Sequence, residues 1–179
     1  MLRASTKESV SIERPAIMGL IIAPMWFTAD QGAKWWAIQH LMDYPEQVVP
    51  VTAFFNLALG WNRGVSFGML SGLALPPWSL ALLALAVSAI LLIWLWRTPS
   101  WLVSCGLGLL VGGALSNALD RLRYGAVTDF LDFHLAGWHW PAFNLADAGS
   151  VCGALALMLD AFTAGRASRS TSQEEMGHQ

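Results

Sequence analysis

Long apolar runs separated by short polar segments dominate the chain, and four of these runs approach the length of a membrane-spanning helix. The runs 77–96 and 101–119 contain no charged residue. A helix of about 20 residues crosses the hydrocarbon core of a bilayer. The runs 15–36 and 141–162 also reach that length, although each carries charged residues. We therefore predict an all-α membrane protein with four transmembrane helices.

Two of the connecting segments differ from ordinary polar loops. Between the first two runs, residues 48–57 are rich in β-branched and aromatic side chains, which predicts short strands. Between the last two runs, residues 120–140 are similarly aromatic and also rich in carboxylates. We expect both segments to form small, β-rich extracytoplasmic loops at the membrane interface.

The polar segments at the two ends complete the predicted domain organisation. Residues 15–166 would form one four-helix membrane domain, preceded by a cytoplasmic segment at 1–14. The tail 167–179 is rich in Ser, Thr, Gln and Glu, and we predict that it is disordered and cytoplasmic. A cleaved signal peptide is not expected, because no small-residue cleavage site follows the first apolar run.

Lys and Arg residues near the spans predict the orientation, because cytoplasmic flanks carry an excess of them. Six lie on the side of the two termini, which are Arg3, Lys7, Arg14, Arg97, Arg166 and Arg169. Four lie on the opposite side, which are Lys34, Arg63, Arg121 and Arg123. This bias predicts cytoplasmic termini, with segments 39–75 and 120–140 outside.

The composition agrees with a membrane protein and gives no sign of a nucleic-acid partner. The chain of 179 residues is 55% hydrophobic and 12% charged, whereas soluble domains are about 25% charged. Most of its 10 Trp residues stand at the ends of apolar runs, as interfacial aromatic belts do. A net charge of −2 gives no reason to expect nucleic acid. Cys105 and Cys152 lie in apolar stretches and are predicted to be buried packing residues.

Ionisable residues inside or at the rim of a span are costly, so each is a functional candidate. These are Asp30, Lys34, Asp120, Arg121, Asp129 and Asp147. Asp129 and Asp147 stand out, because neither has Lys or Arg within four residues. Two carboxylates in a low-dielectric site share one proton, so the pair can activate water and protonate a scissile bond. The residues alone leave open that both are unrelated polar groups bonded to an amide and a hydroxyl.

The remaining candidates have plainer interpretations. We predict that Asp120 forms a structural ion pair at a helix end with Arg121 or Arg123. Asn117 and Asn144 would either orient a peptide or join helices by hydrogen bonds. Two rival functions also fit an acidic pair, a proton-coupled transporter and a catalytically inactive membrane scaffold, although the absence of internal repeats disfavours the transporter.

Five sequence blocks together resemble the lipoprotein signal peptidase (signal peptidase II) family of membrane aspartic proteases. They are ADQGAK from Ala29, NRGVSF from Asn62, GGALSNALDR from Gly112, GAVTDF from Gly125 and FNLAD from Phe143. Two positions depart from the family pattern, which usually has Thr at Ala33 and Gly at Ser116. Ala33 lacks a hydroxyl near Asp30, and Ser116 adds bulk beside Asn117.

This resemblance implies hydrolysis of the peptide bond just before a diacylglyceryl-modified cysteine in prolipoproteins. It implies that Asp129 and Asp147 are the catalytic dyad. It also implies that the site is completed by Asn62, Asn117, Arg121, Asn144 and Asp30. No metal or organic cofactor is expected, and membrane lipids and globomycin-like inhibitors are the other expected partners. The location would be the bacterial inner membrane, with the active site on the periplasmic side.

Overall fold

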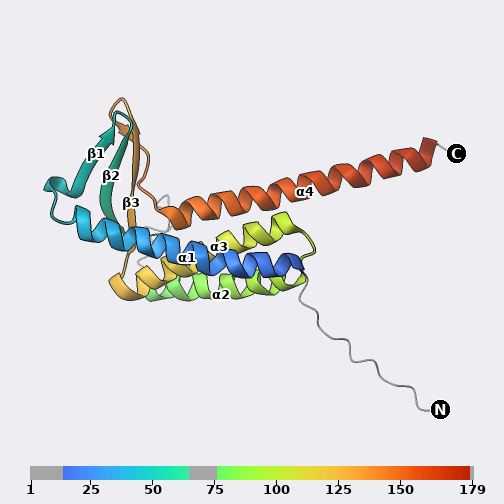
Figure 1. Ribbon diagram of the computed structural model, residues 1–179, viewed down its shortest axis with the longest axis horizontal. Coiled ribbons are helices and arrows are strands. Elements are labelled where there is room, and N and C mark those ends of the chain that lie inside the picture. The colour runs from blue at the N-terminus through green and yellow to red at the C-terminus, as the bar shows by residue number, and fades with distance from the viewer. Residues whose placement is uncertain (1–13, 65–75, 178–179) are drawn as a thin grey trace, which may run out of the picture.

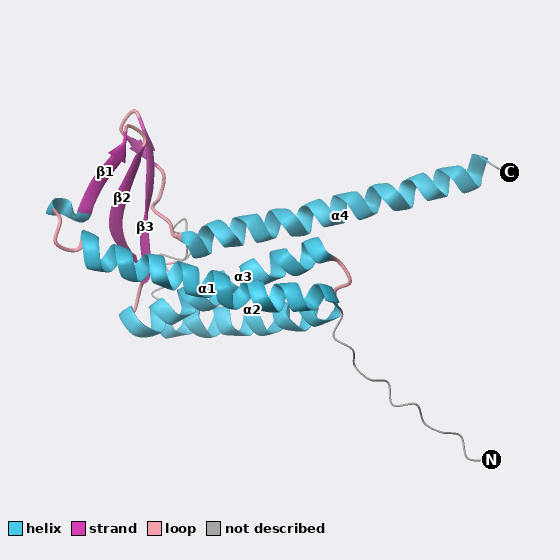
Figure 2. Ribbon diagram, viewed as in Figure 1, coloured by secondary structure: helices cyan, strands magenta, loops and turns pink. Residues whose placement is uncertain are grey.

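The computed structural model describes residues 14–64 and 76–177, which contain four α-helices and a small antiparallel sheet. Figures 1 and 2 show the helices side by side and the sheet at one end of the bundle. In chain order, the elements are α1 (Arg14–Leu41), η1 (Pro45–Gln47), β1 (Val48–Thr52), β2 (Phe55–Asn62), α2 (Pro77–Arg97), α3 (Trp101–Tyr124), β3 (Val127–Leu135), β4 (Trp138–His139) and α4 (Leu145–Gly177). Residues 65–67, the second half of the predicted NRGVSF block, lie outside the described residues.

Helix α3 is the centre of the bundle and packs against each of the other three helices. Small residues let the backbones approach closely, as is common between helices in membranes. A Cβ atom on Gly112 would lie 2.5 Å from the carbonyl oxygen of Ala23 in α1. A Cβ atom on Gly113 would lie 2.7 Å from the carbonyl oxygen of Ala146 in α4. Neighbouring glycines in α3 therefore bring α1 and α4 onto two of its faces.

Within residues 14–64 and 76–177, three helices are long and apolar enough to cross a membrane, namely α2, α3 and the Leu145–Ala164 part of α4. Large apolar side chains on α2 and α4 point away from the bundle, where a bilayer would cover them. Ile90 is 65% exposed and Phe162 is 74% exposed. The prediction of a mostly helical membrane protein with β-rich loops is confirmed. Helix α1, which carries the buried Asp30 and Lys34, is not among the three.

The sheet has the strand order β1-β2-β3-β4, and all neighbouring strands are antiparallel. Its first two strands coincide with the segment predicted to be extended. In the central pair, Leu57 faces Leu131 and Asn62 faces Val127. The sheet packs on the end of α1 through a buried cluster of Ala37, Leu41, Leu59 and Phe130. Helix α1 begins at the end of the bundle away from the sheet, and α4 runs past that end, beyond the other helices (Figure 1).

The helix boundaries differ from the apolar runs at four places. Helix α3 continues past the run 101–119 to Tyr124, through the first residues of the segment predicted to be a loop. Helix α1 continues to Leu41, because the sheet covers its last turns. Helix α4 begins at Leu145 rather than near Pro141, because Phe143 is held in an extended bridge to Leu131. It then runs to Gly177, through most of the tail whose composition favoured disorder. Residues 166–176 contain neither Pro nor Gly, the two residues that most strongly disfavour a helix.

Candidate active site

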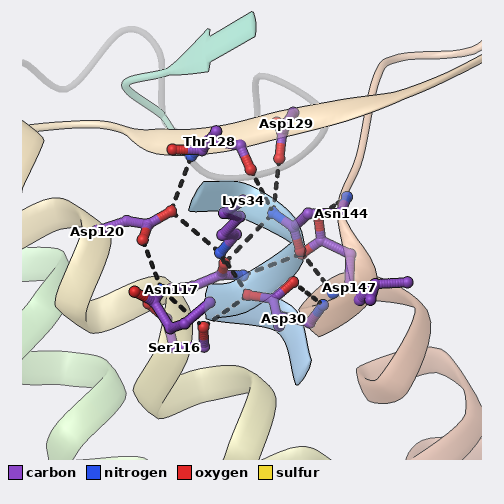
Figure 3. A network of polar contacts seen from close by, with 12 residues as sticks. Asp30, Lys34, Ser116, Asn117, Asp120, Thr128, Asp129, Asn144 and Asp147 are labelled. Atoms are coloured by element: carbon purple, nitrogen blue, oxygen red, sulfur yellow. Dashed lines mark hydrogen bonds and ion pairs between the residues drawn. The ribbon is translucent and has the colours of Figure 1, made fainter. Parts of the chain in front are cut away.

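Asp129 and Asp147 come from different elements and meet at one asparagine (Figure 3). Asp129 lies within strand β3, and Asp147 lies in the first turn of α4. The side-chain amide of Asn144 donates to Asp129 Oδ1 at 2.7 Å. The backbone N–H of the same Asn144 donates to Asp147 Oδ2 at 3.3 Å. The two carboxylates singled out from the sequence are therefore brought together.

The start of α4 fixes the orientation of Asp147. Asn144 precedes the helix, and its Oδ1 accepts the backbone N–H of Asp147 at 3.0 Å. Because Asp147 accepts the N–H of Asn144 in return, the two residues form a reciprocal capping box. The carboxylate also lies at the positive end of the helix dipole, which favours a negative charge. The local sequence Asn-Leu-Ala-Asp thus dictates where this carboxylate points.

Two further asparagines each contact one member of the pair. Asn62, at the end of β2, donates from Nδ2 to Asp129 Oδ2 at 3.1 Å. Asn117, in α3, donates from Nδ2 to Asp147 Oδ1 at 3.2 Å. Three asparagines predicted for the site therefore hold both carboxylates, and they do so through neutral N–H donors.

The environment of Asp129 favours its protonated form. Its side chain is only 4% exposed. Burial raises the pKa of Asp129 to about 7, with a further contribution from the negative charge of Asp147. The hydrogen bonds from Asn62 and Asn144 and the positive charge of Lys34 act in the opposite direction. The Asp129 carboxyl group therefore keeps its proton to a much higher pH than an exposed aspartate does.

Lys34 is the cation at the centre of the buried network, and sequence reasoning gave it no specific partner. Its ammonium group lies 2.7 Å from Asp30 Oδ2 and 3.0 Å from Asp120 Oδ2. It also donates to Asn117 Oδ1 at 2.7 Å, and its side chain is 2% exposed. The spacing of Asp30 and Lys34 was a usable signal, because residues four apart lie on one helix face.

The predicted partners of Asp120 were wrong. Asp120 is paired with Lys34 of α1, not with Arg121 or Arg123. Consecutive residues on a helix point in different directions, so Arg121 does not face the same side as Asp120. Its guanidinium group instead donates to the carbonyl oxygens of Gly64, at 3.2 Å, and Asn117, at 3.3 Å. Charges on Asp147, Asp129 and Asp120 all act on Arg121, so it belongs to the same site.

Asp30 joins three helices. Its Oδ1 accepts the backbone N–H of Ala146 in α4 at 2.8 Å, and its Oδ2 accepts the hydroxyl of Ser116 in α3 at 2.6 Å. Ser116 therefore adds a hydrogen bond as well as the bulk expected from the sequence. Its Oγ also accepts from the side-chain amide of Gln31 at 2.9 Å. Ala33, the other departure, packs against the cluster beneath the sheet.

A pocket of about 510 Å³ lies beside Asp147, on the outer side of the first turns of α4. Its lining consists of Asn62, Trp140, Pro141, Ala142, Phe143, Asp147, Ala148, Val151 and Cys152. Seven of these are apolar, and the two polar residues belong to the carboxylate network. Val151 is 60% exposed, so the pocket reaches the surface that a bilayer would cover. Among residues 14–64 and 76–177, no cluster of His, Cys, Asp and Glu could hold a metal ion.

Comparison with known proteins gives a consistent result. Residues 22–163 match the family described as signal peptidase (SPase) II. A lipoprotein signal peptidase of Rhodopseudomonas palustris (strain TIE-1) is 42% identical over 152 residues, which cover 82% of this chain and 92% of that protein. A lipoprotein signal peptidase of Ralstonia nicotianae is 45% identical over 139 residues, which cover 76% of this chain and 79% of that protein.

The fold also resembles that of a solved structure. A bacterial membrane enzyme solved by the in meso method at 2.3 Å resolution aligns with a TM-score of 0.69 and 24% identity. The alignment covers 81% of this chain and 87% of that one. At this identity the similarity establishes the fold alone.

Proposed function

The chain belongs to the signal peptidase II family and removes signal peptides from prolipoproteins, and on this premise we propose that Asp129 and Asp147 form its catalytic dyad. The observation that carries the proposal is the double contact of Asn144, which bonds one carboxylate through its side chain and the other through its backbone. Family membership also removes the transporter and the inactive scaffold as competing functions.

The proposed chemistry is hydrolysis by a carboxylate pair that shares one proton. The ionised carboxylate takes a proton from water as the water oxygen attacks the scissile carbonyl carbon. The protonated carboxyl group gives its proton to the carbonyl oxygen, which forms a gem-diol. The first carboxyl group then protonates the leaving nitrogen while the C–N bond breaks. One gem-diol proton returns to the second carboxylate, so the pair ends in its starting state.

The raised pKa of Asp129 supports this role, because a group that titrates near pH 7 can both hold and release a proton there. Asn62, Asn117 and Asn144 would keep the two carboxylates oriented during the cycle. Arg121 would hold the backbone at Gly64 beside the substrate. We propose that Asp30 supports the first turn of α4.

We propose that the scissile bond lies just before a diacylglyceryl-modified cysteine. The acyl chains of such a residue stay in the bilayer, because each buried CH₂ contributes about 0.8 kcal/mol. A protease for this substrate needs carboxylates at the membrane surface and an apolar approach from the side. The pocket beside Asp147 supplies apolar walls on the outer face of α4. Membrane lipids would border this opening, and globomycin-like peptides would occupy the same pocket.

We also propose that α1 is a fourth span and that residues 15–166 form one membrane domain. Helix α1 runs along α3, which is itself long and apolar enough to span. Its charged residues Asp30 and Lys34 are buried inside the bundle, so they would not face lipid. Both termini would then be cytoplasmic, and the dyad and sheet would lie at the periplasmic face of the bacterial inner membrane.

Cysteine labelling tests this topology. With Cys105 and Cys152 replaced by Ala, the variants Ser172→Cys and Gln47→Cys would be exposed to an impermeant thiol reagent in intact cells. We expect labelling at position 47 and protection at position 172. Protection at 47 with labelling at 172 would refute the orientation.

The dyad is tested with purified protein in detergent and a diacylglyceryl-modified proprotein, by the gel shift on cleavage. Asp129→Asn and Asp147→Asn should each abolish cleavage, because an amide keeps the shape but cannot carry the shared proton. The double variant should be no less active than either single one, because the two groups act as a unit. Binding of a globomycin-like peptide should persist and report a folded site.

A matched control lies on the same strand. Asp132 is buried and accepts a side-chain hydrogen bond from Asn56 at 2.8 Å, but it contacts neither member of the pair. Asp132→Asn should therefore keep turnover within a few-fold of wild type. A tenth or more of wild-type turnover in Asp129→Asn or Asp147→Asn would exclude that residue from the dyad.

A further inference from the structure

Two backbone hydrogen bonds link the buried ion cluster to the dyad. Asp120 Oδ2 accepts the N–H of Thr128 at 3.0 Å, and Thr128 immediately precedes Asp129. Asp30 Oδ1 accepts the N–H of Ala146 at 2.8 Å, and Ala146 immediately precedes Asp147. Each of the two carboxylates that pair with Lys34 therefore holds the residue just before one member of the dyad.

Lys34 is the only cation that touches both of these carboxylates in the described part of the chain. The three N–H donors of an ammonium group match its three acceptors, which are Asp30, Asp120 and Asn117. The third acceptor extends the same pattern, because the amide of Asn117 also donates to Asp147 Oδ1. Figure 3 shows Lys34 between the residues that carry these bonds.

We propose that Lys34 is a positioning residue that sets both the separation and the protonation of the two catalytic carboxylates. This inference rests on the proposed dyad. Through Asp120 the ammonium group anchors strand β3 at Thr128, and through Asp30 and Asn117 it anchors the first turn of α4. Lys34 is 2% exposed and does not line the pocket, so it acts through these residues and not on the substrate.

The charges give the proposal a second, independent consequence. The charged groups around Asp129 are Asp147 from α4, Lys34 from α1 and Arg121 from α3. Removing the cation at Lys34 leaves its two carboxylates unpaired and makes the ionised forms of the dyad less favourable. Both limbs of the pH–activity profile should then move to higher pH. Removing a negative charge at Asp120 should move the limbs in the opposite direction.

Lys34→Met tests the first half, because Met has a similar length but neither charge nor donors. We expect kcat to fall about tenfold or more, as small displacements of reacting groups do, with KM changed less than about threefold. We expect the pH–activity profile to shift upward by about half a unit or more.

Asp120→Asn tests the second half. The variant should fold, because Gln31, which bonds Asp120 Oδ1 at 2.7 Å, can turn its amide oxygen toward the new NH₂ group. Its profile should shift to lower pH.

The control is a buried polar contact between the same two helices at the far end of the bundle. Ser104 in α3 accepts the N–H of Gly19 at 3.1 Å and donates to the carbonyl oxygen of Pro15. Ser104→Ala should lower thermal stability but leave kcat and the pH–activity profile unchanged. A purely structural role for Lys34 would make Lys34→Met behave in the same way.

The outcomes separate the two proposals. Opposite shifts in Lys34→Met and Asp120→Asn support the positioning role. Unshifted profiles with near-normal kcat overturn it, while inactive Asp129→Asn and Asp147→Asn would leave the dyad standing. Turnover in either of those two variants refutes the dyad instead. If Lys34→Met does not accumulate as folded protein, Asp120→Asn decides alone, and a profile that stays in place overturns the inference.

Discussion

The contact between α3 and α4 at Gly113 allows the spacing of the dyad to be tested by adding one methyl group. In Gly113→Ala the new Cβ would lie 2.7 Å from the carbonyl oxygen of Ala146 and 3.3 Å from its Cα. Ordinary contact between nonbonded atoms begins near 3.5 Å, so the first turn of α4 must retreat by roughly 0.8 Å. That turn carries Asp147, and its Ala146 N–H is bonded to Asp30 at 2.8 Å.

Two magnitudes follow from this displacement. Overpacking of a close contact costs about 1–3 kcal/mol of stability. A 1 Å misplacement of reacting groups can cost about 10²-fold in rate, so we expect kcat to fall by about 10- to 100-fold. KM should change less than kcat, because the substitution leaves the chemistry of every lining residue of the pocket unchanged.

The matched control is Gly106→Ala on the same pair of helices. Its Cβ would lie 2.8 Å from the carbonyl oxygen of Gly153, so the overlap is similar. Gly153 follows Asp147 by about 9 Å along the helix at a rise of about 1.5 Å per residue. Purified variants would be compared by thermal unfolding in detergent and by cleavage of a diacylglyceryl-modified proprotein. Gly106→Ala should lose stability but keep kcat within a few-fold. Wild-type kcat in a folded Gly113→Ala protein would refute the argument from spacing.

Two further predictions concern pH and the Ser116 hydroxyl. Because burial raises the pKa of Asp129 to about 7 in the folded protein, from an ordinary value of about 3.9, the stability due to this group is complete below about pH 4 and is lost as pH rises through 7. The unfolding temperature of wild type should therefore fall more between pH 4 and 8 than that of Asp129→Asn, and equal slopes would contradict the pKa. Ser116→Gly should cost about 1 kcal/mol through its lost hydrogen bond and leave turnover within a few-fold, because Asp30 keeps Lys34 and Ala146. A loss of activity as large as that of a dyad variant would show that the hydroxyl is required for catalysis.

Much of the fold follows from local patterns in the sequence. The run 77–96 became α2 almost residue for residue, and the run 101–119 became the first five turns of α3, because an uncharged apolar stretch of that length satisfies its backbone hydrogen bonds in a bilayer only as a helix. Helix α3 then continues to Tyr124, through the charged residues at 120–123. The β-branched segment 48–57 became strands, as its side chains favour. The end of α1 was less predictable, because its last turns are stabilised by the sheet that packs on Leu41.

The candidate site also has a part that the sequence reveals and a part that it does not. Asp129 and Asp147 could be found from the sequence, because isolated carboxylates in apolar segments are costly wherever the chain places them. The partners of Lys34 and Asp120 could not, because their contact depends on how α1 is rotated against α3. The register of β2 against β3, which brings Asn62 to Asp129, also has no local signal.

The donors around the four carboxylates explain why a shared proton would belong on the proposed dyad. Asp30 and Asp120 each contact the ammonium group of Lys34 and a backbone N–H group. Among the described residues, Asp129 and Asp147 receive hydrogen bonds from the neutral N–H donors of Asn62, Asn144 and Asn117. A cation in direct contact would favour two ionised carboxylates, and the pair would then lack the acid that hydrolysis requires. Lys34 contacts Asp30, Asp120 and Asn117 rather than the proposed dyad itself. It would thereby hold the two carboxylates close together without displacing the proton that they share.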